Sequence, residues 1–168
     1  MAARDVLKNI NLFVDGRGYA GQVQSVSPPV LSLKTEEFMA GGMAGPIELS
    51  MSMEKMESSF TLSAYDLDIL ALFGVAEGSQ VNFTIRGVLE SFDGTTKAVA
   101  HFMRGKVKKL DSGEQKPGEI GPLKVEMTVV YYRLEHTGRV IQEIDVENMV
   151  YMANGVDILA ARRAALGI

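Results

Sequence analysis

The chain contains no cysteine and no tryptophan, and only two of its 168 residues are histidines. Without cysteine there can be no disulfide, no thiolate metal site and no cysteine nucleophile, which fits a reducing compartment. His101 and His136 are far apart in sequence and form neither an HxH nor an HExxH pattern. We therefore expect no metal site built on these side chains.

Other signatures of catalysis and cofactor binding are also missing. Gly41-Gly42 is not followed by the Gly-Lys-Ser/Thr of a phosphate-binding loop, and no GxSxG elbow occurs. Asp66 and Asp68 are typical of the charges at the start of a helix rather than of an acid/base pair. The acidic segment 111–119 lacks the ligand spacing of a calcium loop. These absences predict a protein that is not an enzyme and that binds no cofactor or metal.

Long apolar runs are absent as well, since none approaches the ~20 residues that span a membrane. The first residues, MAARDVLKNINLF, have no apolar core of a signal peptide. A formal charge of −4 and a pI near 5.2 argue against nonspecific binding of nucleic acid. We expect a single domain over residues 1–168 that is made in the cytoplasm and is not stably inserted in a membrane.

The dominant hydrophobic period is two, which predicts strands. Two segments switch to a helical pattern, Ser63–Phe73 in mid-chain and Val156–Leu166 near the end. The expected fold is mainly β: an antiparallel sandwich or barrel with one mid-chain helix and one short C-terminal helix. Its expected strands cover residues 11–14, 19–26, 30–38, 46–53, 57–62, 80–92, 95–110, 123–135 and 139–145.

Methionine is concentrated in one part of the chain. Five of the ten methionines lie between Met39 and Met56, two of them in a loop of glycine and alanine. Methionine is flexible and polarisable, so it suits surfaces that pack against a partner. The loop between Phe38 and Pro46 has no His, Asp, Cys or Lys, so we expect it to make contacts rather than perform chemistry. It comprises Met39, Ala40, Gly41, Gly42, Met43, Ala44 and Gly45.

The strands between Pro46 and Arg86 are expected to share one polar face of small, hydroxylated or acidic residues. One interpretation is a plain solvent-facing sheet. The other is the lining of a conduit, because such side chains repel phosphates and offer little adhesion to a passing DNA or protein. The face would comprise Glu48, Ser50, Ser52, Glu54, Glu57, Ser59, Thr61, Asn82, Thr84 and Arg86.

Charge is uneven along the chain. Residues 34–77 contain eight acids and two bases, whereas residues 97–109 contain five bases and no acid. This contrast suits head-to-tail association of identical copies, although a solvated strand face would show it too. A long sheet must also close or pair its edges, and a heterologous ring removes every edge. The expected basic strand between subunits carries Arg104, Lys106, Lys108 and Lys109.

Six stretches spread over the whole chain make the sequence resemble the major tube protein of contractile phage tails, a family that includes the tubes of R-type pyocins. They are NLFVDGRGYAG (11–21), KTEEFMAGGMAGPIEL (34–49), MRGKVKKLDSGEQKPGE (103–119), YYRLEHTGR (131–139), IDVENM (144–149) and NGVDILAARRAALGI (154–168).

The resemblance implies a β-barrel-like subunit that forms hexameric rings, which stack head to tail into a hollow tube. It implies a contractile sheath around the tube, baseplate and tail terminator proteins as further partners, and a lumen through which DNA or ions pass without specific binding. It also implies assembly in a virion tail or bacteriocin particle inside a bacterial host. The Met39–Gly45 loop would reach an adjacent ring, and the strands after it would contribute to the lumen wall.

Two alternatives remain open. The tube of a type VI secretion device is the same class of object. A monomeric, small-ligand-binding β-barrel belongs to another class, and the scarcity of aromatic residues argues against it.

Overall fold

The structure, a computed structural model, describes residues 4–76 and 78–168. Within these residues it has twelve strands and two helices, mostly in antiparallel pairs, which confirms the predicted fold class. In chain order the elements are β1 (Val6–Val14), β2 (Arg17–Gly18), β3 (Val23–Ser27), β4 (Leu33–Phe38), β5 (Ile47–Met53), β6 (Met56–Leu62), α1 (Leu67–Leu70), β7 (Val81–Glu90), β8 (Thr96–Asp111), β9 (Leu123–His136), β10 (Arg139–Asp145), β11 (Val150–Ala153), β12 (Val156–Asp157) and α2 (Ala160–Leu166).

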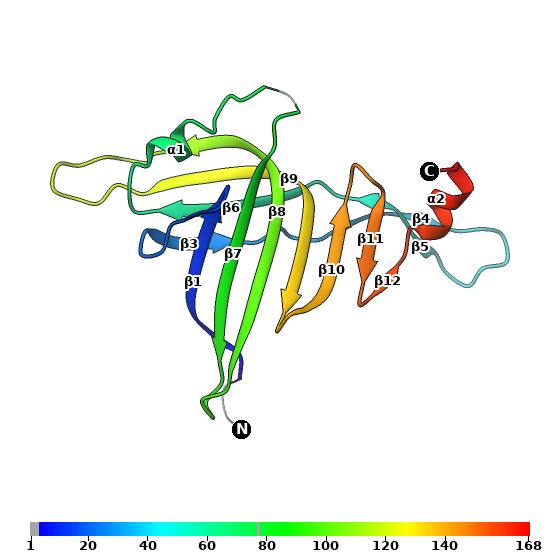
Figure 1. Cartoon of the computed structure of the whole chain (residues 1–168). Coiled ribbons are helices and arrows are strands. Elements are labelled where there is room, and N and C mark those ends of the chain that lie inside the picture. Colours follow the sequence, from blue (N-terminus) through cyan, green and yellow to red (C-terminus); the bar gives the residue numbers. More distant parts are fainter. Residues whose placement is uncertain (1–3, 77) are drawn as a thin grey trace.

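Ten strands form one sheet that bends into two layers (Figure 1). Strands β8 and β9 stay paired with each other and pass from one layer to the other. The first half of β9 pairs with β6 and its second half with β10, while β7 pairs with only the first part of β8. The first layer therefore contains, in order, β2, β1, β7, the first part of β8, the second half of β9, β10, β11 and β12. The second layer contains β3, β6, the first half of β9 and the last part of β8.

The core lies between the two layers, and it follows the alternation that the sequence shows. In β6 and in the first half of β9 every second side chain is buried. Burying one large apolar side chain stabilises the fold by about 1.5–3 kcal/mol. The largest fully buried side chains are Phe83, Leu12, Met56, Leu62, Ile69, Leu123, Met127, Ile144, Val107 and Val125.

Helix α1 closes one end of the two-layered body. Its Ile69 is completely buried, and the carboxylate of Asp66 caps it by accepting hydrogen bonds from two backbone N–H groups. The predicted helix over Ser63–Phe73 is too long at both ends. Ser63 cannot cap it, because its N–H and hydroxyl both donate to the carbonyl of Gln22.

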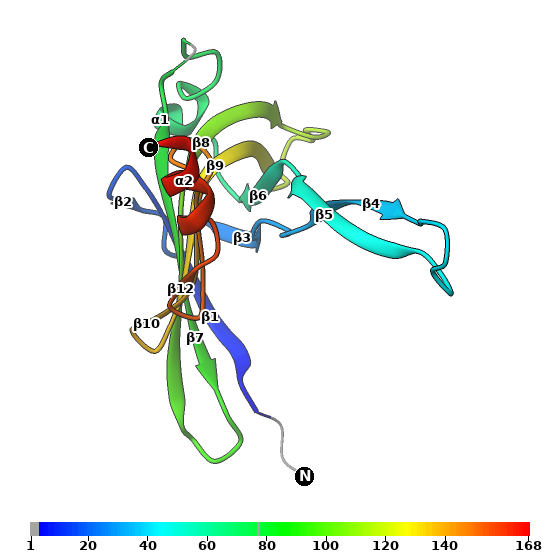
Figure 2. The same ribbon diagram turned by 90° about the vertical axis from the view of Figure 1, so that its right-hand side faces the viewer.

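Strands β4 and β5 form a two-stranded ribbon that leaves the body, as Figures 1 and 2 show. We call this ribbon, together with the loop from Met39 to Pro46 at its tip, the arm. The ribbon prolongs the pairing of β3 with β6, because the N–H of Glu54 donates to the carbonyl of Ser32 between the two pairs. Within the described residues, β4 and β5 pair only with each other.

Two other predicted elements differ from the structure. The expected strand over residues 19–26 is interrupted, because Tyr19 folds into the core and Gly21 takes a positive φ of 79°. Only residues from Val23 onwards form a strand, which pairs with β6 in the second layer. The expected C-terminal helix begins at Ala160 rather than at Val156, because Val156 and Asp157 pair with β11.

Candidate assembly surfaces

The arm has one polar and one apolar face, and neither is covered within the described residues. Every residue of β4 and nearly every residue of β5 is exposed. On the apolar face, Leu49 is 44% and Met51 52% exposed, and Phe38 lies opposite Ile47. Such a contiguous exposed apolar surface marks an interaction site.

The predicted contact loop, Met39–Gly45, forms the tip of the arm, far from the body (Figure 2). A tight turn shapes it: the N–H of Met43 donates to the carbonyl of Ala40, and the N–H of Ala40 donates to the sulfur of Met43 at 3.2 Å. Gly42 has a φ of 92°, which other residues rarely adopt. Met39 is 64% exposed, so the loop presents a methionine to the surroundings.

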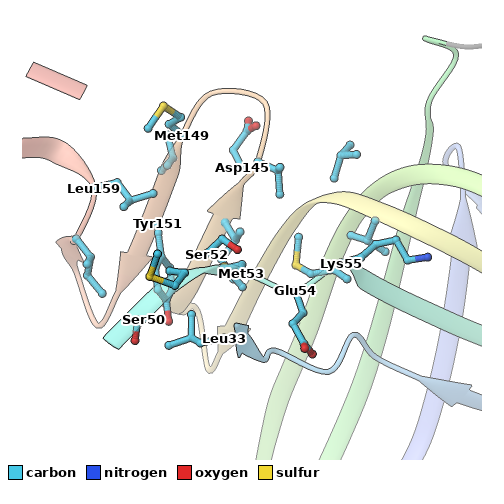
Figure 3. A pocket seen from close by; sticks show the side chains of 18 of the residues that line it. Leu33, Ser50, Ser52, Met53, Glu54, Lys55, Asp145, Met149, Tyr151 and Leu159 are labelled. Carbon is cyan, nitrogen blue, oxygen red and sulfur yellow. The ribbon is translucent and has the colours of Figure 1, made fainter. Parts of the chain in front are cut away.

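A groove of about 770 Å³ lies where the arm joins the body. Figure 3 shows Leu33 and Met53 of the arm on one side and Tyr151 and Leu159 on the other. Met149 also lines it. We call this hollow the base groove. Local sequence patterns do not reveal this groove, because its walls come from segments about 100 residues apart and include the very short strands β11 and β12.

The ten residues of the predicted polar face do not form one surface. Glu48, Ser50 and Ser52 lie on the arm, and Glu57, Ser59 and Thr61 alternate with the buried residues of β6. Met53 and Met56 line the base groove, and so do Ser50, Ser52 and Glu54, so the base of the arm presents polar as well as apolar side chains to this groove. Glu54 and Lys55 form the two-residue connection between β5 and β6. As a result, the apolar residues have odd numbers in β5 and even numbers in β6.

For Asn82, Thr84 and Arg86 the prediction of a shared face is wrong. They alternate with buried residues of β7, which belongs to the first layer, so they point outward from the opposite side of the core. They border a shallow hollow that includes Phe13 and Phe102. The prediction failed because β6 and β7 follow each other in the sequence, whereas the chain crosses from one layer to the other between them.

The outer face of the second layer carries an alternating set of ion pairs. The ammonium of Lys108 lies 2.7 Å from the carboxylate of Glu57, and that of Lys55 lies 2.6 Å from the same group. Lys109 lies 3.9 Å from Glu126, which also contacts Lys124 at 3.4 Å. The face therefore contains both signs of charge, because lysines of β8 and β9 that were not part of the predicted face lie beside its acids.

The predicted basic strand is divided between the layers. Arg104 belongs to the first layer, where its guanidinium lies 5.4 Å from the centre of the Tyr131 ring and 3.7 Å from Asp145. Lys108 and Lys109 belong to the second layer and have the partners just described; Lys106, in the same part of β8, also interacts within the chain. Beyond Gly105, β8 pairs on one side with β9, and its other edge meets no strand in the described part of the chain.

Glu57 provides a test of this charge arrangement. Hydrogen bonds from Lys108 and then Lys55 lower its pKa from 4.5 to about 2. Because the pKa is lower in the folded state, the pairs stabilise the fold above pH 4.5, and this contribution is lost as the pH falls towards 2. We expect NMR titration of the monomeric protein to give that low pKa, and Lys108→Met to raise it. Lys124→Met, which removes a partner of Glu126, serves as the control and leaves the pKa of Glu57 unchanged.

The histidines take part in pairwise contacts. Nδ1 of His101 lies 2.9 Å from the hydroxyl of Tyr132, and burial lowers the pKa of His101 and raises that of Tyr132 to about 12. His136 contacts the hydroxyl of Thr137 at 3.2 Å. No group of three or more metal-ligating side chains occurs in residues 4–76 and 78–168. In the same residues, no helix has the length and apolar character needed to cross a bilayer.

Comparison with known proteins identifies the family to which the chain belongs. The model of the family described as phage tail tube protein FII matches residues 4–167. The chain is 34% identical to the tail tube protein of Escherichia phage P2 over the full length of both, and 27% identical to the major tail tube protein of Serratia phage KSP20 over all of this chain and 99% of that one. It also shares its fold with a chain of the PVC sheath–tube complex, an extracellular contractile injection system, with a TM-score of 0.58, 12% identity, and coverage of 75% of this chain and 87% of that one.

The family match spans nearly the whole chain, and the P2 relative aligns from end to end, so the expected kind of protein is confirmed. The exposed arm and the uncovered base groove agree with a protein that works in an assembly. The chain belongs to the phage tail tube protein FII family and is a structural, non-enzymatic tube subunit of a contractile tail or tail-like particle.

Proposed function

We propose that six copies of this chain form a ring and that rings stack head to tail into a hollow tube. The observation that carries this proposal is the arm, whose apolar face is uncovered in one copy. Strand edges on the arm and on the end of β8 would be completed by neighbouring copies, which removes the hazard of open edges. Acidic residues of the arm, such as Glu36 and Glu37, would lie near Lys108 and Lys109 of a neighbour.

The bore of this tube would be lined by the outer face of the second layer and the polar face of the arm. Of the predicted lining residues, Glu48, Glu57, Ser59 and Thr61 would belong to this surface, whereas Ser50, Ser52 and Glu54 line the base groove. Its hydroxyl groups and balanced charges suit the passage of DNA or ions without specific binding. Asn82, Thr84 and Arg86 would then face away from the bore, because they lie on the opposite layer.

The tip loop, Met39–Gly45, would contact the next ring. We further propose that the tube lies within a contractile sheath, as the name of the PVC complex states for its own tube, and ends at baseplate and terminator proteins. Synthesis would take place in the cytoplasm of the bacterial host. The relatives from phages P2 and KSP20 support a phage tail more than a type VI secretion device.

Purified protein tests this proposal directly. We expect negative-stain electron microscopy to show hollow tubes, and end-on views to show sixfold rings. Size-exclusion chromatography with light scattering should show mass that rises with concentration. A lone monomer at every concentration, with a melting temperature that rises when a small apolar ligand is added, would instead support the ligand-binding barrel.

A further inference from the structure

The two ends of the two-layered body differ. One end is closed by α1, whose Ile69 is fully buried against the core. The other end, beside the arm and α2, holds the base groove. Figures 1 and 2 agree that α1 and the arm lie at opposite ends of the molecule. One end is therefore filled by the chain's own helix, and the other is not.

The base groove continues into the uncovered face of the arm. Met51 and Leu33 line the groove and remain 52% and 46% exposed, and Ile158 on the opposite wall is 53% exposed. Leu49 extends the same apolar surface along β5. A groove of about 770 Å³ could hold a small molecule, but the apolar surface continues out of it along the exposed strand β5, which suits a protein segment better than a compact ligand.

The closed end carries exposed apolar side chains of its own. Leu67, the first residue of α1, is 82% exposed, and Tyr65 and Phe73 on either side of the helix are 46% and 55% exposed. We call these three residues the α1 patch. Because Ile69 is anchored in the core and Asp66 accepts a hydrogen bond from the hydroxyl of Tyr19, the segment that carries the patch is held in place.

A head-to-tail ring brings the opposite ends of neighbouring copies together, whereas a twofold contact would pair like ends and stop at a dimer. The charges beside both surfaces allow such a contact. Beside the α1 patch Arg17 pairs with Asp68, and Asp66 adds one negative charge. The groove lining carries two acids, Glu54 and Asp145, and two bases, Lys55 and Arg162, so the two surfaces do not carry strong charges of the same sign.

We infer that the base groove of each subunit receives the α1 patch of the next subunit in the ring. This inference rests on the proposed ring, and it names the lateral contact within it. Leu67 enters between the arm and α2, and the arm then covers the closed end of the neighbour. The body of each copy is thus completed at its open end by a second copy of the same chain.

Cysteine cross-linking tests this contact, because the natural chain has no cysteine. Leu67→Cys is combined in turn with Met51→Cys, Met149→Cys and Leu159→Cys, and assembled tubes are treated with a short bis-maleimide. We expect covalent oligomers from at least one pair, since the two positions of a pair are at opposite ends of one copy. Leu67→Cys with Val88→Cys, an exposed position on the outer face of the first layer, serves as the control and should give none.

A second variant gives an independent result. Leu67→Asp should lower the yield of tubes at least tenfold without changing the melting temperature of the monomer, because the side chain is 82% exposed. Three results would overturn the inference and leave the tube function intact. They are normal tubes with Leu67→Asp, tubes in which none of the three cysteine pairs gives a cross-link, and assembled tubes in which the base groove still binds an apolar dye. Absence of any tube in the unmodified protein would overturn the proposed function itself.

Discussion

Deletion of Gly41–Ala44 is expected to leave a folded subunit that forms no long tubes. These residues belong to the tip of the arm, and none of them is a member of the hydrophobic core or of the residues packed against it. The shape of the loop depends on the local turn between Ala40 and Met43. The melting temperature and the far-ultraviolet circular dichroism of the monomer should therefore stay as they are. The length of assemblies in negative-stain images should fall to single rings or short stacks.

A single substitution should have the same effect. If Met43 is buried between rings, each contact contributes about 1.5–3 kcal/mol. Six copies per ring then make the loss from Met43→Asp on the order of 10 kcal/mol for each ring-to-ring contact, before any cost of burying the new carboxylate. Met43→Leu is the matched control, because it keeps an apolar side chain of similar volume but lacks the sulfur that accepts the hydrogen bond from the N–H of Ala40. It should preserve tubes.

The outcome also separates two roles for the loop. Tubes of normal length after Met43→Asp and after the deletion would show that the loop does not join the rings. Loss of tubes after Met43→Leu as well would show that the turn held by the sulfur, rather than apolar burial, is what the contact needs. Subunits that fail to fold would contradict the independence of the arm from the core.

Local patterns in the sequence predicted most strands because alternation and turns are local properties. The hairpin of β7 and β8 around Asp93-Gly94 is an example: Gly94 takes a φ of 80°, and the N–H of Thr95 donates to the carboxylate of Asp93. The strand that begins at Leu123 follows its predicted alternation. The tip loop is also where the sequence placed it, because glycine and proline interrupt the pairing there.

The division into layers could not be predicted in the same way. Strands β8 and β9 keep an alternating pattern while they pass from one layer to the other, so polarity alone does not reveal the bend. The pairing of β6 with β9 joins residues more than 60 positions apart. The predicted polar face consequently included Asn82, Thr84 and Arg86, and the base groove was missed, since both depend on which distant strands become neighbours.

Gly105 marks the bend, and its replacement should have the largest effect on stability. It is buried in β8 at the position where the register with β9 shifts and the pairing with β7 ends. A Cβ atom there would lie 2.0 Å from the carbonyl oxygen of Thr128 and 3.0 Å from the Cα of Val129. Both neighbours are backbone atoms of β9, so they can move only if the two strands that connect the layers separate.

We expect Gly105→Ala to lower the free energy of unfolding by about 3 kcal/mol or more. For a chain of this length that corresponds to a melting temperature lower by roughly 10 °C. The measurement is best made with Met43→Asp as the background, because a subunit that does not assemble gives a simple transition. A protein that accumulates only in the insoluble fraction would agree with the same expectation.

Two other glycines set the scale for this result. At Gly87 the added Cβ would meet side-chain atoms, Cδ1 of Leu7 at 2.8 Å and Cγ1 of Val99 at 2.9 Å. Side chains yield more easily than the backbone of a paired strand, so Gly87→Ala should cost less than Gly105→Ala. At Gly45 nothing lies within 4 Å, and Gly45→Ala should change the stability by no more than about 0.5 kcal/mol. If all three substitutions changed the free energy of unfolding by the same small amount, the fold would not depend on the close approach of β8 to β9 at Gly105. An ordered series, with Gly105→Ala the most damaging, is what the bend requires.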